Sequence, residues 1–559
     1  MNLEKFLNFL SPLASPAEIK NWDSVAGEYG LDEFLLMENA GRSALSVLLN
    51  YRPNLKNKKI ILFMGKGNNG GDAACLARNL IDYGAQCYLF AYKTREQFKG
   101  ACKRHLELAI DNGVHFFTFN LLENINKKNF LYDIILSSTN SIPDIIVDGL
   151  LGTGFKGTLK IELQKLIEEI NFYSCQTPEC FVLALDIPSG LNPVTGYPSP
   201  VAIRANATAS FAAIKLGEIF SYARKWTGFL HECNIGIPKK IISNNAPEAW
   251  LLDGKALQCI PDPEENSYKN YYGHTVIMGG TRGYSGAAHL AALAALATGS
   301  GLVSVVSPAV SAERIKAGFP EVMIYKLGSD GNSFWPDHIE EELEILLQKA
   351  DSIVVGPGFG RGADSANFLE SFFKIPLNKP VVLDADALII MSKHRTLINY
   401  LTGKDIITPH PGEAAALLEI ATEDVQMDRK KSLESLCALS DAAVVLKGAN
   451  TLIGQSALPF FVCPYDIPQM AIGGAGDVLS GCIGSLSGFR QLSQRPAIQL
   501  AAMGVIWHAL AGLICAQSCH DRGVLASTLA KSLSKVKGHF NCLPPLGSSG
   551  KIQPWPQSD

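Results

Sequence analysis

The 559-residue chain has no excess of charge of either sign and no cysteine framework. Its 49 Lys and Arg against 53 Asp and Glu give a formal net charge of -4, and no long basic run occurs. This balance does not favour nucleic acid or an anionic membrane surface as a partner. The 13 cysteines are odd in number and lack metal-ligand spacing, which predicts a reducing, cytoplasmic compartment.

Internal repeats are missing as well. The apolar stretch at 287–302 is shorter than the roughly 20 residues that a membrane span needs, and glycines interrupt it, so we expect a packed helix and strand. The first 16 residues include Glu4 and no apolar core, so no signal peptide is expected. With 47% hydrophobic and 18% charged residues, the chain is typical of a globular protein of two to four domains.

The most informative stretch is Gly473-Gly474-Ala475-Gly476-Asp477, which precedes an apolar helix expected from Val478. Its glycines leave backbone N–H groups accessible at a helix N-terminus, where the helix dipole also favours an anion. A carboxylate beside a phosphate is costly unless it accepts a proton. Asp477 is therefore typical of a general base that activates a hydroxyl for attack on phosphorus. Alternatively, Asp477 is an ordinary capping acid of this helix.

The first half of the chain places polar residues after an apolar strand at 58–64. The segment Gly65-Lys66-Gly67-Asn68-Asn69-Gly70-Gly71-Asp72 follows this strand, and a helix is expected from Ala73. The pattern G-x-G-x-x-G is typical of dinucleotide sites, but the next strand, at 86–91, ends without the acid that holds a ribose. A hydride-transfer NAD site is therefore not expected. The amides and the carboxylate instead predict a site for a polar ligand and a hard cation such as K⁺.

Two more apolar strands end in the same way. Strand 145–147 leads to Asp148 and a glycine-rich segment, and strand 181–185 leads to Asp186-Ile187-Pro188-Ser189-Gly190. Either ending alone is compatible with simple turn chemistry. Because open α/β sheets bind ligands at the carboxyl ends of their strands, the three endings together predict one site.

This half of the chain resembles the NAD(P)H-hydrate epimerase domain over about residues 15–235. The resemblance rests on Leu36-Met37-Glu38-Asn39-Ala40-Gly41, residues 67–72, Asp148 with Gly152-Thr153-Gly154, and residues 186–190, in the family's order. It implies that Asn69, Asp148 and Ser189 bind K⁺. It also implies that the hydrated nicotinamide nucleotide is contacted by Asn68, Asn69, Gly70, Gly71, Asp72, Gly152, Thr153, Gly154, Phe155, Lys156, Gly157, Thr158 and Asp186.

Epimerisation suits such a site because the hydrate carries a hydroxyl on C6, next to the ring nitrogen. The nitrogen lone pair can expel hydroxide to give an iminium ion, and water can return on the other face. We expect Asp186 to stabilise the cation and to move the proton. Ala73 stands where the family usually has glycine, and its methyl group is expected to narrow the pocket.

The second half restarts the α/β pattern after a segment rich in Pro, Lys and Asn at 235–262, in which we expect a linker at 241–262. Apolar strands lead in turn to the glycine-rich segment 279–288, Gly356-Pro357-Gly358, Asp384-Ala385-Asp386, Thr408-Pro409-His410-Pro411-Gly412-Glu413 and Lys447-Gly448-Ala449-Asn450-Thr451. Strands alternating with helices predict a mainly parallel sheet between helical layers, with its ligand edge at these strand ends.

This order resembles the ADP- or ATP-dependent NAD(P)H-hydrate dehydratase domain, which has the ribokinase-like fold, over about residues 255–535. The discriminating segments are 279–288, 319–323, 408–413 and 473–477. The resemblance implies that Ala287, Gly358, His410 and Asp477 contact the hydrate. It implies that Lys447, Gly448, Ala449, Asn450, Thr451 and Gly476 contact the nucleotide. Asp477 then deprotonates the C6 hydroxyl, which attacks the terminal phosphorus while the 473–476 amides hold the developing charge.

Three of these positions also have a plainer interpretation. His410 lies between two prolines, which is typical of a rigid turn with a satisfied histidine. Lys447 is compatible with a solvated turn lysine. Ala475 stands where the family commonly has Thr or Ser, which removes a hydroxyl, although the backbone donors remain and activity is expected.

The sequence therefore predicts a two-domain α/β enzyme that repairs hydrated nicotinamide cofactors. We expect a Rossmann-like α/β/α epimerase domain at 1–240, a linker at 241–262, a ribokinase-like dehydratase domain at 263–540 and a flexible tail at 541–559. Resemblance to fused bacterial enzymes implies ADP with Mg²⁺ as cosubstrate, releasing AMP and phosphate.

The expected partners are the NADH and NADPH hydrates and ADP, without nucleic acid or membrane, in a possible homo-oligomer. The alternative is a ribokinase-like small-molecule kinase whose N-terminal domain is a noncatalytic binding module.

Overall fold

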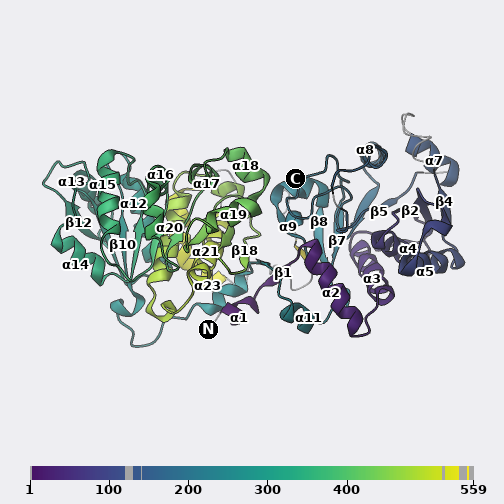
Figure 1. Cartoon of the computed structure of the whole chain (residues 1–559), viewed down its shortest axis with the longest axis horizontal. Helices are drawn as coiled ribbons and strands as arrows, with labels where there is room; N and C mark the ends of the chain where they lie inside the picture. Colours follow the sequence, from purple (N-terminus) through teal and green to yellow (C-terminus); the bar gives the residue numbers. More distant parts are fainter. Residues whose placement is uncertain are drawn as a thin grey trace. The chain divides into compact units, whose positions relative to one another are not determined.

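The computed structural model describes residues 3–119, 130–139, 142–155, 157–518, 523–539 and 551–552. The chain forms two compact α/β units (Figure 1). The N-terminal unit comprises Pro12–Ala249 with Leu546–Asp559, and the C-terminal unit comprises Met1–Ser11 with Trp250–Pro545. Each unit is built on a mostly parallel sheet, so the predicted α/β class is confirmed.

The N-terminal unit has an eight-stranded sheet in the order β19-β8-β7-β6-β5-β2-β3-β4. Neighbouring strands are parallel except for β19 against β8. The strands are β2 (Lys59–Met64), β3 (Gln86–Ala91), β4 (His115–Thr118), β5 (Ile145–Gly149), β6 (Phe181–Leu185), β7 (Ala207–Phe211), β8 (Phe229–Cys233) and β19 (Lys551–Ile552). The strand order reverses between β2 and β5, and such a switch point is where open α/β sheets bind ligands.

Helices cover both faces of this sheet. Alternate residues of β2 serve the two sides: Ile60 and Leu62 belong to one hydrophobic core, Ile61 and Phe63 to the other. The first core includes side chains of α2 (Pro16–Glu28), α3 (Glu33–Tyr51), α4 (Asn68–Ile81) and α5 (Gly100–Asp111), and the second those of α7 (Phe130–Thr139) and α8 (Ile161–Gln176). The unit is therefore a three-layer α/β/α structure.

The C-terminal unit has an eleven-stranded sheet in the order β1-β9-β18-β17-β16-β15-β14-β13-β10-β11-β12. The strands from β10 to β16 pair in parallel, whereas β17 and β18 pair antiparallel. The strands are β1 (Ser11–Leu13), β9 (Ala249–Leu251), β10 (His274–Met278), β11 (Leu302–Pro308), β12 (Met323–Leu327), β13 (Ser352–Val355), β14 (Val381–Leu383), β15 (Ile406–Ile407), β16 (Ala443–Leu446), β17 (Leu452–Gly454) and β18 (Phe460–Val462). Its order reverses between β10 and β13, which predicts a second ligand edge.

Small and aliphatic residues let three helices pack closely in one large core of this unit, namely α12 (Ser285–Thr298), α20 (Ala475–Gly488) and α21 (Ala497–Ser518). The apolar stretch at 287–302 is thus a helix followed by β11, as predicted. The other helices here include α13 (Ala309–Gly318), α14 (Glu341–Lys349), α15 (Ala363–Phe373), α16 (Asp386–Lys393), α17 (Pro411–Leu418), α18 (Thr422–Met427), α19 (Arg429–Cys437) and α22 (Ala526–Ser532).

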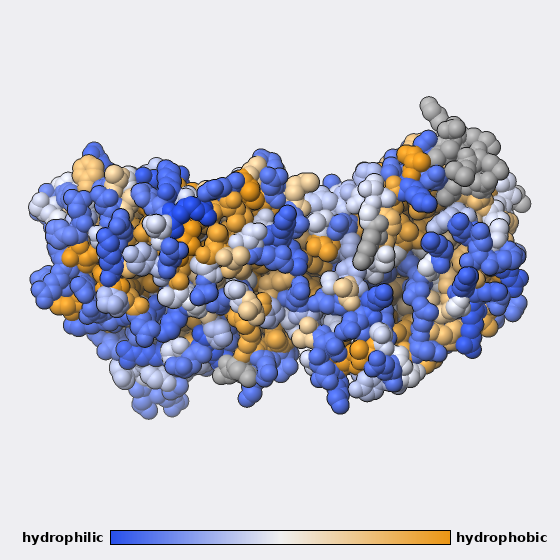
Figure 2. All heavy atoms as spheres, in the orientation of Figure 1, coloured by the Kyte–Doolittle hydropathy of each residue, from blue (hydrophilic) through white to orange (hydrophobic). Residues whose placement is uncertain are grey.

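Helix α21 is the one described helix that is long and apolar enough to cross a membrane, and its apolar window is wholly buried in this core. Buried core helices of folded domains can have the same length and apolar composition. On the face shown in Figure 2, hydrophilic side chains predominate and hydrophobic ones gather in small groups.

The ends of the units differ from the predicted domain limits. Residues 3–7 form α1 (Leu3–Leu7) in the C-terminal unit, where the fully buried Phe6 packs edge-on against Phe461 with ring centroids 5.6 Å apart. The expected linker carries the end of α11 (Lys239–Asn244), β9 and a 3-10 turn, and the units meet in sequence within it. Of the expected tail, only β19 lies within the described residues.

Candidate active sites

Helix α4 begins earlier than the sequence pattern predicts. Its N-cap is Gly67, so 68–72 form its first turns rather than a loop. Gly70 permits this arrangement, because a Cβ there would lie 2.0 Å from the carbonyl oxygen of Gly65 at the end of β2. The glycines therefore let the helix start directly against the strand end, and their presence does not by itself require a ligand.

The three expected K⁺ ligands lie together at the ends of β5 and β6 and the start of α4. Ser189 donates from Oγ to Asp148 Oδ1 at 2.6 Å and from its backbone N–H to Oδ2 at 2.7 Å. Asn69 Nδ2 donates to the carbonyl oxygens of Leu151 at 2.9 Å and Leu185 at 3.1 Å. The Leu151 carbonyl also accepts from Ser189 Oγ at 3.2 Å, which links the two sides of the cluster.

One oxygen in this cluster has no hydrogen-bond donor. Asn69 Oδ1 is buried and unpartnered, although buried polar atoms are nearly always satisfied. Asp148 is fully buried, and burial raises the pKa of its carboxyl to about 6. An orphaned amide oxygen, a carboxylate and a hydroxyl form the all-oxygen donor set that a hard cation prefers, so these residues fit K⁺.

Asp186 is held by a residue that the sequence did not indicate. Its backbone has a φ of 63°, its Oδ1 accepts from Lys215 Nζ at 2.5 Å, and its Oδ2 accepts from the Thr153 N–H at 2.9 Å. Lys215 is fully buried, and its Nζ also donates to Ser210 Oγ at 3.1 Å and the Phe211 carbonyl at 3.2 Å. The Asp186 carboxylate is thus fixed between an ammonium and a backbone donor.

Two more acids interact electrostatically with Asp186. Asp72 is 7% exposed, and burial, with the charge of Asp186 adding to it, raises the pKa of Asp72 well above its usual range. Burial likewise raises the pKa of Asp23 to about 6, with Asp186 and Glu33 adding to the effect. Sequence reasoning missed Asp23. Several carboxyls around one lysine give this site a group that holds a proton near neutral pH.

The glycine-rich segment after β5 borders the same carboxylate. A Cβ at Gly152 would lie 2.8 Å from Asp186 Oδ2, so only glycine fits beside it. Further along, Phe155 is half-buried, and the exposed residues are Gly154, Gly157 and Thr158. Lys156 lies outside the described residues.

Ala73 does not narrow the pocket as expected. Its side chain is fully buried, and a Cβ added at Gly149 on β5 would lie only 2.7 Å from the Ala73 Cβ. The extra methyl group therefore occupies the interface between α4 and the sheet.

In the C-terminal unit, α20 begins at Ala475 with Gly474 as its N-cap at a φ of 93°. This is three residues before the predicted start, and it places Asp477 in the first turn. The positive φ of Gly474 requires glycine, and a Cβ there would also lie 2.6 Å from Leu290 Cδ1, at the end of that side chain. The first N–H groups of an α-helix lack intrahelical acceptors, so this turn is suited to binding an anion.

Asp477 lies near a buried ion pair. Lys447 Nζ donates to Asp384 Oδ1 at 2.6 Å and lies 3.7 Å from Glu413 Oε2. A Cβ at Gly476 would lie 3.4 Å from Lys447 Nζ, so the ammonium lies against the glycine turn. Burial, then Asp384, raises the pKa of Asp477 to about 7, whereas Lys447 lowers it. A carboxyl with this pKa can accept and release a proton near neutral pH.

The site therefore includes Asp384 and Glu413, which the sequence placed in strand-end motifs without a role. The pairing also shows that the interpretation of Lys447 as a solvated turn lysine is wrong, because its side chain is 15% exposed and ion-paired.

His410 caps α17, as its plainer interpretation has it. Its Nδ1 accepts the N–H groups of Gly412 at 3.0 Å and Glu413 at 3.3 Å, and its Nε2 lies 3.2 Å from Glu413 Oε1. Since Nδ1 is an acceptor, the ring proton belongs on Nε2. The side chain is 53% exposed, so a ligand can still reach the ring.

The other two expected hydrate contacts lie side by side. Gly358 has a φ of 58°, and a Cβ there would lie 2.5 Å from the Tyr284 carbonyl oxygen and 3.2 Å from Ala287 Cβ. Glycine is again the residue that this close approach requires.

The expected nucleotide segment forms the turn between β16 and β17. Asn450 is fully buried at a φ of 56°, and its Nδ2 donates to the Pro464 carbonyl at 3.1 Å. Thr451 Oγ1 donates to the Gly448 carbonyl at 3.0 Å. These two side chains therefore hold the conformation of the turn.

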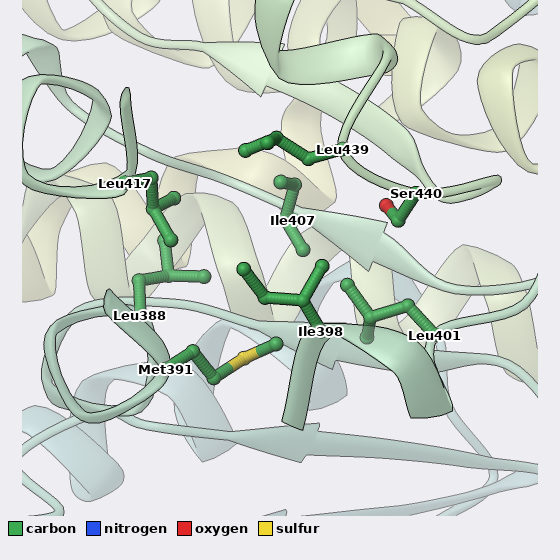
Figure 3. A pocket seen from close by; sticks show the side chains of 8 residues that line it. All are labelled: Leu388, Met391, Ile398, Leu401, Ile407, Leu417, Leu439 and Ser440. Atoms are coloured by element: carbon green, nitrogen blue, oxygen red, sulfur yellow. The ribbon is translucent and has the colours of Figure 1, made fainter. Parts of the chain in front are cut away.

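A separate pocket of this unit is apolar and lies between α16, α17 and β15 (Figure 3). Apart from one serine its lining is hydrophobic: Leu388, Met391, Ile398, Leu401, Ile407, Leu417, Leu439 and Ser440. It has no charged side chain to bind a phosphate, so we do not assign it to the reaction.

Comparison with known proteins links both sites to one family. The family model described as YjeF-related protein N-terminus matches residues 33–217, and the model described as NAD(P)H-hydrate dehydratase matches residues 275–535. The bifunctional NAD(P)H-hydrate repair enzyme of Coxiella burnetii is 32% identical over 92% of this chain and 96% of that protein. The chain belongs to the bifunctional NAD(P)H-hydrate repair enzymes. The predicted family is thereby confirmed.

Other members of this repair-enzyme family align over a similar length. The Moorella thermoacetica enzyme is 31% identical over 94% of this chain and 96% of its own. Among solved structures, a ribokinase-like superfamily protein from Enterococcus faecalis aligns with a TM-score of 0.44 and 25% identity, covering 52% of this chain and 96% of that one. The two matched ranges fall in different compact units, so each unit of the repair enzyme carries one family domain.

Proposed function

We propose that the N-terminal unit interconverts the R and S hydrates of NADH and NADPH, and that the C-terminal unit dehydrates the S form with ADP, releasing AMP and phosphate. The observation that carries this proposal is Asp477. It lies in the first turn of α20 beside three glycines, and its pKa is raised to about 7. A base of this pKa next to an anion-binding turn suits phosphorylation of a hydroxyl.

In the dehydration, the hydrate contacts Ala287, Gly358, His410 and Asp477. Asp477 takes the proton of the C6 hydroxyl, whose oxygen forms a bond to the terminal phosphorus as AMP leaves with the electrons of the broken P–O bond. N–H groups of the 473–476 turn donate hydrogen bonds to the oxygens that carry the developing negative charge. The ring nitrogen then expels phosphate from C6, and loss of the neighbouring proton restores the reduced cofactor. Mg²⁺ accompanies the nucleotide and offsets its phosphate charge.

In the epimerisation, Asp186 faces the iminium ion that forms when hydroxide leaves C6. Its carboxylate is held in place by Lys215 and the Thr153 N–H, so it stabilises the cation without reorganising. Asp72 shares the movement of the proton, since burial keeps its pKa high. Asn69, Asp148 and Ser189 would hold K⁺, which supplies a fixed positive charge when bound. Exchange of K⁺ for Li⁺ is then expected to slow epimerisation.

The remaining assignments belong to the same proposal. The epimerase contacts are residues 68–72 and 152–158, and the nucleotide contacts are 447–451 with Gly476. We also place the enzyme in the cytoplasm, in line with the odd number of its 13 cysteines, and propose a homo-oligomer as its candidate assembly.

The test follows NADH absorbance while the purified chain acts on separated R and S hydrates with Mg²⁺ and either ADP or ATP. We expect NADH from both epimers, faster with ADP, and none from the Asp477→Asn variant. That variant should still convert R to S, which is followed by chromatography. If no NADH forms with either nucleotide, the dehydratase assignment fails and a small-molecule kinase becomes the better hypothesis.

A further inference from the structure

Asp384 is rigidly placed at the end of β14. Its backbone N–H donates to the Val355 carbonyl at 3.0 Å, its carbonyl accepts from the Ala387 N–H at 3.2 Å, and it is 1% exposed. Its partner Lys447 is tied equally firmly, since its backbone N–H donates to the Pro409 carbonyl at 2.9 Å. The 2.6 Å ion pair therefore joins two fixed strand ends.

This ion pair lies against the turn that carries the base. From the position of a Cβ at Gly476, Lys447 Nζ is 3.4 Å away and Asp384 Oδ2 is 3.9 Å away. Gly476 directly precedes Asp477. The charges of the pair are thus adjacent both to Asp477 and to the 473–476 N–H groups that are proposed to donate hydrogen bonds to phosphate.

We propose that Asp384 is a positioning residue of the dehydration: it holds the ammonium of Lys447 against Gly476, where the ammonium faces Asp477 and the anion turn. This role rests on the proposed function of Asp477 as the base. Without its partner, a flexible lysine side chain would sample many rotamers and would not offer a fixed charge. Asp384 itself need not touch the hydrate or the nucleotide.

Glu413 does not replace Asp384 as the anchor. It is 3.7 Å from Lys447 Nζ, and its Oε2 accepts the His410 N–H at 2.8 Å to close the capping box of α17. Its Oε1 lies against the His410 ring. The hydrogen-bonded partner of the ammonium is Asp384.

The charged groups around Asp477 come from several elements. Asp384 after β14, Asp386 of α16 and Glu413 of α17 raise its pKa, and Lys447 after β16 lowers it. Asp386 is itself paired with Arg361 at 2.6 Å. Burial, together with the charge of Lys447, lowers the pKa of His410 and of His508 on α21, to about 4 for His508. Both imidazoles are therefore neutral near pH 7.

The decisive experiment is the pH profile of kcat/KM for the S hydrate in Asp384→Asn. Asp384 raises the pKa of Asp477 more than Lys447 lowers it, so loss of the Asp384 charge should outweigh the release of the ammonium, and the acidic limb should move to lower pH. The ammonium is no longer held, so kcat should fall by about 10- to 100-fold, with the KM for the hydrate changed by less than about threefold. Asp384→Glu should recover part of kcat.

Two variants separate this role from a structural one. Lys447→Met removes the positive charge, so its acidic limb should move to higher pH, opposite to that of Asp384→Asn; this arm holds even if Asp384→Asn does not fold. Asp405→Asn is the matched control, because Asp405 is a buried acid of the same sheet that accepts from Val381 and Thr402. It should lower stability and leave the profile in place.

The outcomes distinguish the two levels of the proposal. If the wild-type chain forms no NADH from the S hydrate, the proposed function fails and the role of Asp384 fails with it. If the wild type is active and Asp384→Asn is folded with an unreduced kcat, only the positioning role is overturned. A Lys447→Met limb that moves to lower pH, or does not move, also overturns it.

Discussion

Single buried charges decide the chemistry of each site. Lys215 is fully buried, and its ammonium holds Asp186 at 2.5 Å in a group that also contains Asp23 and Asp72. We expect Lys215→Met to reduce epimerisation by at least about 100-fold, because the carboxylate loses its counter-charge and its fixed orientation. Leaving that buried charge unpaired should also cost about 3–5 kcal/mol of stability.

This prediction has a control within the same polypeptide. Dehydration of the pure S hydrate should be unchanged in Lys215→Met, because the residues proposed for dehydration belong to the other unit. Lys239→Met, at an exposed position, should behave as wild type in both assays. A folded Lys215→Met that epimerises normally would contradict the role given to Lys215.

Residues such as Lys215 and Asp384 mark the limit of what the sequence predicts. The motif acids at 148, 186 and 477 follow apolar strands or glycine turns, a pattern that is visible locally and that the structure brings into two clusters. Lys215 lies 29 positions after Asp186, and Lys447 lies 63 after Asp384. Partners at such separations are brought together by the order of strands in the sheet, which no local pattern reveals.

At the scale of elements, strands were predicted closely and helix starts were not. The bounds of β3 and β6 agree with the expected strands because, apart from Gln86, each consists of apolar residues. Helices α4 and α20 both start early, within glycine-rich turns. Glycine has low helix propensity, so these turns suggest loops, but close packing of the helix start against its neighbours outweighs propensity.

The start of α20 can be tested with two adjacent glycines. Gly474→Ala should destabilise the C-terminal unit by about 2 kcal/mol and slow dehydration by at least about tenfold, since its φ is 93° and its Cβ would overlap Leu290. Gly473→Ala has open space around its Cβ and should change stability by less than about 0.5 kcal/mol. Chemical denaturation and the NADH assay measure both; equal effects of the two variants would show that the turn is not constrained as described.

At the scale of the whole molecule, each unit has its own sheet and its own hydrophobic core. All residues proposed for epimerisation belong to the N-terminal unit, and all those proposed for dehydration belong to the C-terminal unit. The short N-terminal segment is the exception to sequence order, because burial of Phe6 assigns it to the later unit. The residues proposed for each reaction all come from one unit, so the two reactions should be separable by mutation.

Complementation between two inactive variants tests that separation. Asp477→Asn should convert R to S hydrate without forming NADH, and Lys215→Met should use S hydrate but leave R hydrate. A mixture of the two should regain NADH formation from R hydrate, because the S hydrate released by one chain diffuses to the other. The rate should rise with the concentration of the Lys215→Met chain until epimerisation limits it. A mixture that stays inactive would contradict this separation, because it would mean that the Asp477→Asn chain does not release S hydrate to the other chain.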